Sequence, residues 1–343
     1  MYNGEKYIHQ DVLSILNQSF KNYEIIIIND CSIDKTEEII NFLSKKDKRI
    51  KIIKHNQNFG VYHSRIEAVL NSNGKYILFF DPDDMLLNIN LFQSLFNYYL
   101  SYNLDIIEFI VYNQNEGNNQ IYYSESQSSN HNHNFKKTIL YQPELENIIF
   151  YKPNTKKYSM IICRHIWNKI YKRKIALKSI NYIGNFYYNQ NLIVADDTMI
   201  NIINFHFAQN YSNIKIPGYL YIKKKNSMSR GYLGIKVKIK QVISFFYYFK
   251  FLYRYINEFN KDRNFIVPEL NYFKEELIDL YKMNISNYTI QVRQLLDKIY
   301  FDKKSSIEIK KLINKINLTI IKNTIISPRD KSFLNHAHLY NSS

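Results

Sequence analysis

The chain has 343 residues, enough for one large domain or two medium ones with a substantial core. A hydrophobic content of 45% and an aromatic content of 16% argue against a generally disordered chain. The formal net charge of +16 suits an anionic partner, but the basic residues are spread along the chain without an arginine-rich arm, so we expect no nucleic-acid partner.

The chain carries few signals of an extracellular or membrane-spanning protein. Its two cysteines, Cys31 and Cys163, provide neither a disulfide framework nor a zinc site. The start shows no secretory pattern, so we expect a cytoplasmic location. The most apolar stretch, 242–256, contains Lys250 and Arg254 and is therefore expected to form a core helix. The alternative is peripheral association with the cytosolic face of a membrane.

The first hundred residues alternate between helical and strand periods. Helices are predicted at 5–18, from 34, from 61 to near 74, and at 88–102; strands are predicted at 24–28, 50–53, 76–80 and 104–111. The strands are almost wholly apolar, which is typical of strands buried on both faces. The pattern predicts an α/β fold with a mostly parallel sheet and helices on both faces.

The second half is less regular. Residues 113–137 are polar and predict a surface loop or a disordered insertion, in which His131 and His133 are expected to be solvated rather than bound to metal. Residues 140–230 predict shorter elements. From about 235 onward the pattern is helical, with predicted segments at 235–259, 269–284, 288–300 and 306–322.

The most informative stretch is 76–84, where an apolar strand ends in carboxylates around a proline. Asp81, Asp83 and Asp84 follow the carboxyl end of the strand, where open α/β sheets bind ligands, and Pro82 restricts the backbone. Such close like charges are relieved by a shared proton or by a hard divalent cation, Mg²⁺ or Mn²⁺, on a diphosphate. The alternative is a solvated acidic turn with Asp84 as a helix cap.

A second acidic pair, Asp196 and Asp197, precedes a predicted helix at 198–203. Judged from these residues alone, two acids at a helix start are ordinary caps. A carboxylate in such a place can also act as a general base.

Several phrases of the chain keep the order and spacing of the family 2 glycosyltransferases, which are inverting enzymes of the GT-A fold. They are MYNGEKYI at 1–8, QSFKNYE at 18–24, IIIINDCSID at 25–34, NFGV at 58–61, NGKYI at 73–77, DPDD at 81–84, WNKIYKR at 167–173, ADDT at 195–198, YLYI at 219–222 and NSMS at 226–229. The chain resembles that family over roughly residues 1–230. The resemblance implies a Rossmann-like GT-A sheet with a nucleotide-sugar-binding half at 1–112, an acceptor-binding half at 113–230 and a helical C-terminal region at 231–343.

The resemblance also implies a donor site. It implies transfer of a sugar from a nucleotide-sugar, expected to be a UDP-sugar, with Mn²⁺ or Mg²⁺ held by Asp83 together with Asp81 or Asp84. We assign Asp83 and Asp84 to the metal, and Asp81 to the ribose. Asp30 matches the position that recognises the nucleobase; its alternative role is a helix cap or turn. Tyr2 and Asn3 fall in the phrase that follows the family's first strand and are assigned to the donor.

On the acceptor side, the family's acidic pair ends in the catalytic aspartate, which maps to Asp197, and the acceptor is expected to be a saccharide, lipid-linked or other hydroxyl. Trp167 is the single tryptophan. It could line the acceptor or belong to the core. The basic residues Lys223, Lys224, Lys225 and Arg230 could hold the leaving diphosphate or form a solvated charge run.

The sequence departs from the family in one respect and leaves other functions open. The family begins with an apolar strand before the Tyr-Asn-Gly of residues 2–4, and this sequence starts after it. We therefore expect a truncated fragment that folds poorly and has little turnover. Two alternatives remain: a catalytically dead, glycosyltransferase-like binding or scaffold protein, and a nucleotidyltransferase, although no glycine-rich basic phosphate loop is present.

Overall fold

A computed structural model describes residues 1–123, 139–142, 145, 165–187, 192–224 and 235–259. Residues 1–269 form one compact unit. The predicted helices from 269 onward lie outside the described residues, as do His131 and His133.

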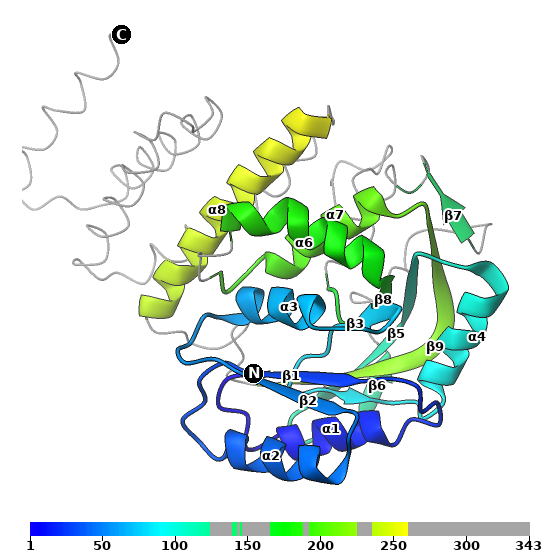
Figure 1. The fold of residues 1–343 in the computed structure, drawn as a ribbon, viewed down its shortest axis with the longest axis vertical. Coiled ribbons are helices and arrows are strands. Elements are labelled where there is room, and N and C mark those ends of the chain that lie inside the picture. The colour runs from blue at the N-terminus through cyan, green and yellow to red at the C-terminus, as the bar shows by residue number, and fades with distance from the viewer. Residues whose placement is uncertain (124–138, 143–144, 146–164, 188–191, 225–234, 260–343) are drawn as a thin grey trace, which may run out of the picture. The chain divides into compact units, whose positions relative to one another are not determined.

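A two-stranded layer near the amino terminus follows the predicted alternation of strands and helices. Ile25–Asn29 (β1) pairs in parallel with Ile50–Lys54 (β2). Figure 1 shows α1 and α2 on one face of this layer and α3 on the other. These helices span Ile8–Leu16, Thr36–Lys46 and Val61–Leu70, respectively. The prediction of helices on both faces is confirmed for this layer.

A larger sheet forms the rest of the α/β core. Its strands run in the order β3-β8-β5-β9-β4, with β6 on β5 and β7 on β9. They span Tyr76–Leu78 (β3), Met85–Leu86 (β4), Ile106–Asn115 (β5), Ile121–Tyr123 (β6), Ile139–Tyr141 (β7), Lys169–Lys172 (β8) and Asn210–Lys223 (β9). Only β5 and β9 pair in parallel among these described strands. The expected mostly parallel arrangement is therefore wrong for this sheet, because its strands do not follow the βα alternation that produces parallel neighbours.

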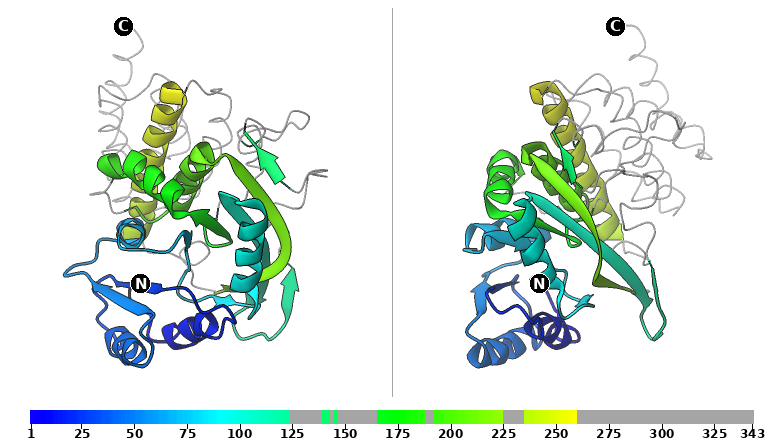
Figure 2. Two further views of the ribbon diagram at one scale, coloured as in Figure 1. Left: turned by 45° about the vertical axis from the view of Figure 1, so that its right-hand side comes forward. Right: turned by 90° about the vertical axis from the view of Figure 1, so that its right-hand side faces the viewer.

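Four further helices complete the described part of the chain; the first two contact the larger sheet, the third packs on the second, and the fourth packs on the third. They are Leu91–Tyr102 (α4), Arg173–Tyr187 (α6), Asp196–Phe207 (α7) and Ile235–Phe259 (α8). Figure 2 shows β5 and β9 side by side along their length, away from the β1–β2 layer. The loop predicted at 113–137 is corrected over 113–123, where β5 continues and turns into β6. None of the described helices has the length and apolar character needed to span a membrane.

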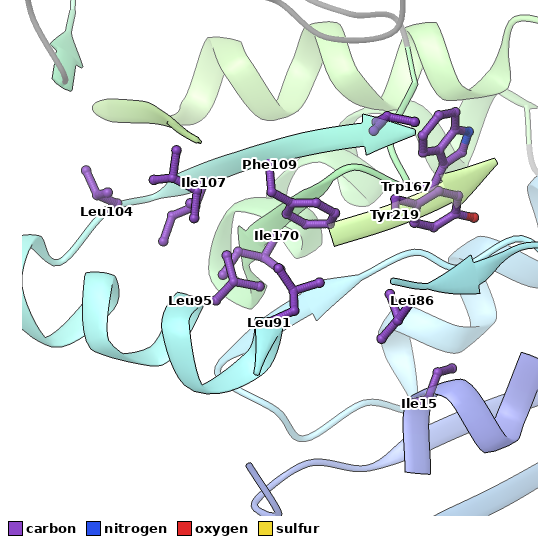
Figure 3. Close-up of a cluster of buried hydrophobic side chains, with 12 residues drawn as sticks. Ile15, Leu86, Leu91, Leu95, Leu104, Ile107, Phe109, Trp167, Ile170 and Tyr219 are labelled. Carbon is purple, nitrogen blue, oxygen red and sulfur yellow. The ribbon is translucent and has the colours of Figure 1, made fainter. Parts of the chain in front are cut away.

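The core under the larger sheet explains two sequence features. Trp167 is buried and stacks on Tyr219, with ring centroids 4.5 Å apart, so it belongs to the core (Figure 3). Gly218 lies inside β9, and a Cβ added there would collide with the Phe109 ring. Glycine therefore lets β9 approach β5 and α4 closely. This packing holds β9 behind the acidic loop after β3.

Candidate active site

The acidic loop 81–84 follows β3 closely, as the sequence predicted. Asp83 has a φ of 119°, which is strained for a residue with a side chain. Its backbone N–H donates to a carboxylate oxygen of Asp11 at 3.0 Å. Burial raises the pKa of Asp11 to about 7, although the hydrogen bond from Asp83 opposes the shift. The loop conformation is thus fixed from α1 as well as from β3.

Asp83 and Asp84 point into different surroundings. The Asp84 side chain is buried, accepts from the Tyr219 hydroxyl at 2.8 Å and accepts from the Ile222 N–H at 2.8 Å. Burial raises the pKa of Asp84 well above its usual range. Asp83 is partly exposed and forms an ion pair with Lys224 at 2.7 Å. The structure thus connects Asp84 to β9 and leaves Asp83 paired with the Lys224 ammonium.

One guanidinium joins the acidic loop to the second acidic pair. Arg65 of α3 donates from Nη2 to Asp81 at 2.8 Å and from Nη1 to Asp196 at 2.5 Å and Asp197 at 2.9 Å. The Arg65 side chain is largely buried, with 11% exposed. Asp81 and Asp197 therefore bind the same guanidinium. They were predicted separately, the first to contact the donor and the second to activate the acceptor.

The two members of the second pair differ in ionisation. Burial raises the pKa of Asp196, while the Arg65 guanidinium opposes the shift. Burial also acts on Asp197, but the charges of Arg65 and His165 outweigh it and lower the pKa of Asp197. Asp197 is therefore ionised near neutral pH. The residue before them, Ala195, has a left-handed backbone with φ 65°, a conformation that is strained for a residue with a side chain.

Asp30 lies at the end of β1, as predicted, and both of its carboxylate oxygens have hydrogen-bond partners within the protein. One oxygen lies 2.6 Å from His55 Nδ1 and accepts from the Phe59 N–H at 2.8 Å; the other accepts from the Gly60 N–H at 2.8 Å. The far nitrogen of His55 lies 2.5 Å from Glu67. These contacts bind the 58–60 loop to β1 and start α3, the helix that carries Arg65.

The amino-terminal phrase lies beside the β1–α2 loop. Asn3 donates its N–H to the Ser32 hydroxyl at 3.0 Å and accepts from the Ile33 N–H at 3.0 Å. Tyr2 is exposed. Cys31 has a φ of 62°, a conformation that glycine adopts freely. Tyr2 and Asn3 therefore sit near Asp30, on an open surface.

The basic residues predicted near the diphosphate have separate positions. Lys224 pairs with Asp83 and lies over the Tyr7 ring, whereas Lys223 lies over the Tyr122 ring. Lys225 and Arg230 lie outside the described residues.

Sequence reasoning missed Arg65, Asp11 and His55 as parts of the site. Arg65 is a single cation in a mostly apolar helix, which was an available signal. Asp11 is an acidic residue on the buried side of α1, next to Val12 and Ile15, which was another. Their partners lie far along the chain, so periodicity could not connect them. In the described part of the chain, His55, His63 and Glu67 also place possible metal-ligating atoms within 4.8 Å of one another.

Comparison with known proteins identifies the family. The family model for "Glycosyl transferase family 2" matches residues 1–178 of the 343. The matched region is more than half of the chain, and the chain therefore belongs to glycosyl transferase family 2.

Curated relatives carry glycosyltransferase names. An uncharacterized glycosyltransferase of Haemophilus influenzae is 43% identical over 95 residues, which are 28% of this chain and 38% of the relative. The uncharacterized glycosyltransferase EpsJ of Bacillus subtilis is 26% identical over 67% of this chain and 61% of its own length. Glycosyltransferase GlyA of Streptococcus pneumoniae is 27% identical over 67% of this chain and 30% of its own. The chain thus spans less than two thirds of these relatives.

Solved structures support the same fold. Residues 1–349 of S. aureus TarS in complex with UDP-GlcNAc match with a TM-score of 0.52 and 17% identity, over 94% of this chain and 87% of that one. The complex of the same protein with UDP matches with a TM-score of 0.51. The GT-A prediction is confirmed by the family and by this likeness.

Proposed function

We propose that the protein transfers a sugar from a UDP-sugar to an acceptor hydroxyl with inversion, with a divalent cation at the acidic loop. The observation that carries the proposal is the Arg65 contact that unites Asp81 of the loop with Asp197 at the start of α7. A donor-binding carboxylate and an ionised base are thereby adjacent, as a single displacement requires. The S. aureus TarS complexes with UDP and UDP-GlcNAc support UDP as the nucleotide.

The residues of the loop fit a cation. The Asp83 carboxylate is partly exposed and already faces a positive charge, the Lys224 ammonium at 2.7 Å. Carboxylate oxygens are the ligands that Mg²⁺ and Mn²⁺ prefer. We assign Asp83 as the principal ligand and Asp81 as the second or as the ribose contact. Asp84, first assigned to the metal, is better suited to hold the loop because both its oxygens face β9.

When bound, such an ion supplies positive charge that stabilises the diphosphate leaving group. Lys224 adds a second positive charge beside the same carboxylate. Asp197 accepts the proton of the acceptor hydroxyl as its oxygen attacks the anomeric carbon from the side opposite the diphosphate. Arg65 keeps Asp197 ionised and oriented, and Asp196 shares that guanidinium.

At the other end of the site, Asp30, Tyr2 and Asn3 are proposed to bind the nucleoside. The Asp30 carboxylate already accepts hydrogen bonds from the Phe59 and Gly60 N–H groups. It therefore contributes by fixing the 58–60 loop as well as by any direct contact with the base. We keep the division at 112 and 230, the cytoplasmic location and the saccharide or lipid-linked acceptor as proposals.

A UDP-release assay tests the function. The full chain is incubated with UDP-sugars and Mn²⁺, with the same incubations for Asp83→Ala and Asp197→Ala. Both variants are expected to lose transfer, but only Asp83→Ala should lose metal-dependent UDP binding. GDP-sugars and TDP-sugars serve as donor controls. Unimpaired transfer by Asp197→Ala would mean that another residue is the base. If the wild-type chain bound UDP but transferred no sugar, the scaffold alternative would be favoured.

A further inference from the structure

Two histidines and a glutamate gather between the end of β2 and α3. His55 directly follows β2, and His63 and Glu67 stand four residues apart on α3. Residues with that spacing share one face of a helix. In the described part of the chain, these three side chains each bring one possible ligand atom to within 4.8 Å of the others. The proposed transfer reaction uses neither His63 nor Glu67.

The His55 ring has a carboxylate at each of its two nitrogens. Nδ1 lies 2.6 Å from Asp30 Oδ1, and Nε2 lies 2.5 Å from Glu67 Oε2. A neutral imidazole can donate from only one nitrogen. One of the two contacts therefore needs either a further proton or a metal cation.

A third atom beside Nε2 favours the cation. His63 Nδ1 lies 3.9 Å from the same Glu67 oxygen that faces His55. A proton is shared by two atoms, whereas a metal ion gathers three or more ligands. Asp30 supplies what a metal-binding histidine needs on its other side, because a carboxylate at Nδ1 holds the ring proton there and directs Nε2 toward the metal.

Packing fixes the two rings and leaves the carboxylate adjustable. His63 stacks on Phe59 with ring centroids 4.6 Å apart, and His55 meets Phe59 nearly perpendicularly at 5.1 Å. The side chains of His55 and His63 are 4% and 9% exposed, whereas that of Glu67 is 27% exposed. Burial lowers the pKa of His63, which favours the neutral ring that binds metals.

The distances need only a small adjustment. Ligand atoms around a four-coordinate zinc ion lie about 3.3 Å apart, given metal–ligand bonds of about 2.0–2.2 Å. The contact of Glu67 with His55 has to lengthen from 2.5 Å and that with His63 has to shorten from 3.9 Å. Each change is under about 1 Å, which a rotation of the partly exposed Glu67 side chain can supply.

We infer that His55 Nε2, His63 Nδ1 and a Glu67 oxygen form a second metal site, separate from the cation site proposed at Asp83, and that its ion is Zn²⁺. Two imidazole nitrogens and one carboxylate are a typical zinc donor set, whereas Mg²⁺ and Mn²⁺ prefer oxygen ligands. The ion connects the end of β2 to α3 and so stabilises the helix that carries Arg65. The inference stands independently of the proposed sugar transfer.

Zinc binding by the full chain tests the inference. The chain is prepared without a polyhistidine tag, treated with EDTA, desalted and titrated with Zn²⁺ in a calorimeter. We expect a Kd of about 10 µM or lower. At free zinc about 100 times Kd, Tm should rise by about 4 °C or more. Glu67→Gln and His63→Phe, which keeps a ring on Phe59, should each weaken zinc binding at least about tenfold.

Matched variants separate this site from other zinc ligands. His9→Phe and Glu38→Gln replace the same residue types at exposed positions and should leave the affinity unchanged. The double change His131→Asn and His133→Asn, outside the described residues, should also leave it unchanged. Asp83→Asn should keep the zinc affinity, because the acidic loop is not the site.

Co²⁺ gives a readout of the ligands themselves. Tetrahedral Co²⁺ with nitrogen ligands absorbs visible light far more strongly than six-coordinate Co²⁺ on carboxylates. The strong absorption is expected in the original chain and in His9→Phe, and should be lost in His63→Phe and Glu67→Gln.

Three results would overturn the inference. A wild-type Kd for zinc above about 10 µM would leave His55 with a proton in place of the ion. An affinity that neither His63→Phe nor Glu67→Gln lowers by about tenfold would mean adventitious binding elsewhere. Loss of zinc binding in Asp83→Asn would place the ion in the acidic loop.

Discussion

The two acidic pairs of the site share one arrangement: in each, one carboxylate is buried and its neighbour is partly exposed. In the loop after β3, Asp84 has 0% of its surface exposed, whereas the Asp83 side chain has 35%. At the start of α7, the Asp196 side chain has 3% exposed and that of Asp197 has 26%. In each pair the buried carboxylate connects distant elements, and its neighbour in sequence reaches the open side.

Burial therefore distinguishes the carboxylates that stabilise the site from those that can take part in its chemistry. A buried carboxylate with satisfied hydrogen bonds stabilises the fold and is poorly placed for a ligand. A partly exposed one beside a cation can exchange partners. Adjacent residues of one type therefore need not share a role, and motif letters alone do not distinguish them.

The largest effect is expected at Asp197, the exposed member of the second pair. Asp197→Asn removes the proposed base but keeps the shape and a hydrogen-bond acceptor for Arg65. We expect kcat to fall by about 10²–10⁴-fold with an unchanged KM for the donor, measured as UDP release at saturating acceptor. A fall of less than threefold, with Tm preserved, would remove Asp197 from the mechanism.

The next effect is on stability and sharpens the contrast in the loop. Asp84→Ala leaves the Tyr219 hydroxyl and the Ile222 N–H without their buried acceptor. We expect a loss of about 2–4 kcal/mol in the free energy of unfolding by urea. The matched change Asp83→Ala removes a partly exposed ion pair and should cost less than about 1 kcal/mol. Equal losses would mean that the two residues are not differently placed.

A smaller effect follows from the raised pKa of Asp11. Burial moves it from 3.8 to about 7, so between these values the folded chain binds more protons than the unfolded chain. The contribution of the protonated carboxyl is fully present below pH 3.8 and is lost as pH rises through about 7. Asp11→Asn cannot ionise, so wild type should lose stability relative to this variant over that window. Urea unfolding of both chains at several pH values measures the difference, and a difference independent of pH would contradict it.

The smallest effect is expected at the exposed edge of the nucleoside end. Tyr2 has 49% of its surface exposed. Tyr2→Ala should raise the KM for the donor by about threefold, because an exposed ring adds modest stacking, and should leave Tm unchanged. Tyr102→Ala, also exposed but on α4, is the control and should leave KM unchanged. Identical KM values for the two variants would remove Tyr2 from the donor site.

Local patterns were sufficient to predict the β1–β2 layer and the acidic loop. Apart from β4, the helices and strands up to α4 were expected within a few residues, because each has its own period and its own start or stop signal. The position of Asp81, Asp83 and Asp84 followed from the apolar run before them. These features depend on neighbours in sequence.

The rest depended on contacts between distant residues. Residues 140–230 were expected to hold shorter elements, yet β9 runs over 14 residues and continues through a register shift opposite Ile110. The burial of Asp84 depends on Tyr219, which lies 135 residues away. The Arg65 contact with Asp197 spans 132 residues. No local pattern could indicate which of two adjacent carboxylates meets such a partner.

Calorimetric titration of UDP tests the central claim most directly. The full chain is titrated with UDP in Mn²⁺, in EDTA, and as Asp83→Asn in Mn²⁺, with Asp47→Asn, an acid paired with Arg49 outside the site, as the control. We expect binding that requires the cation and weakens at least about tenfold in Asp83→Asn but not in the control. Binding of equal affinity in EDTA, or by Asp83→Asn, would contradict it.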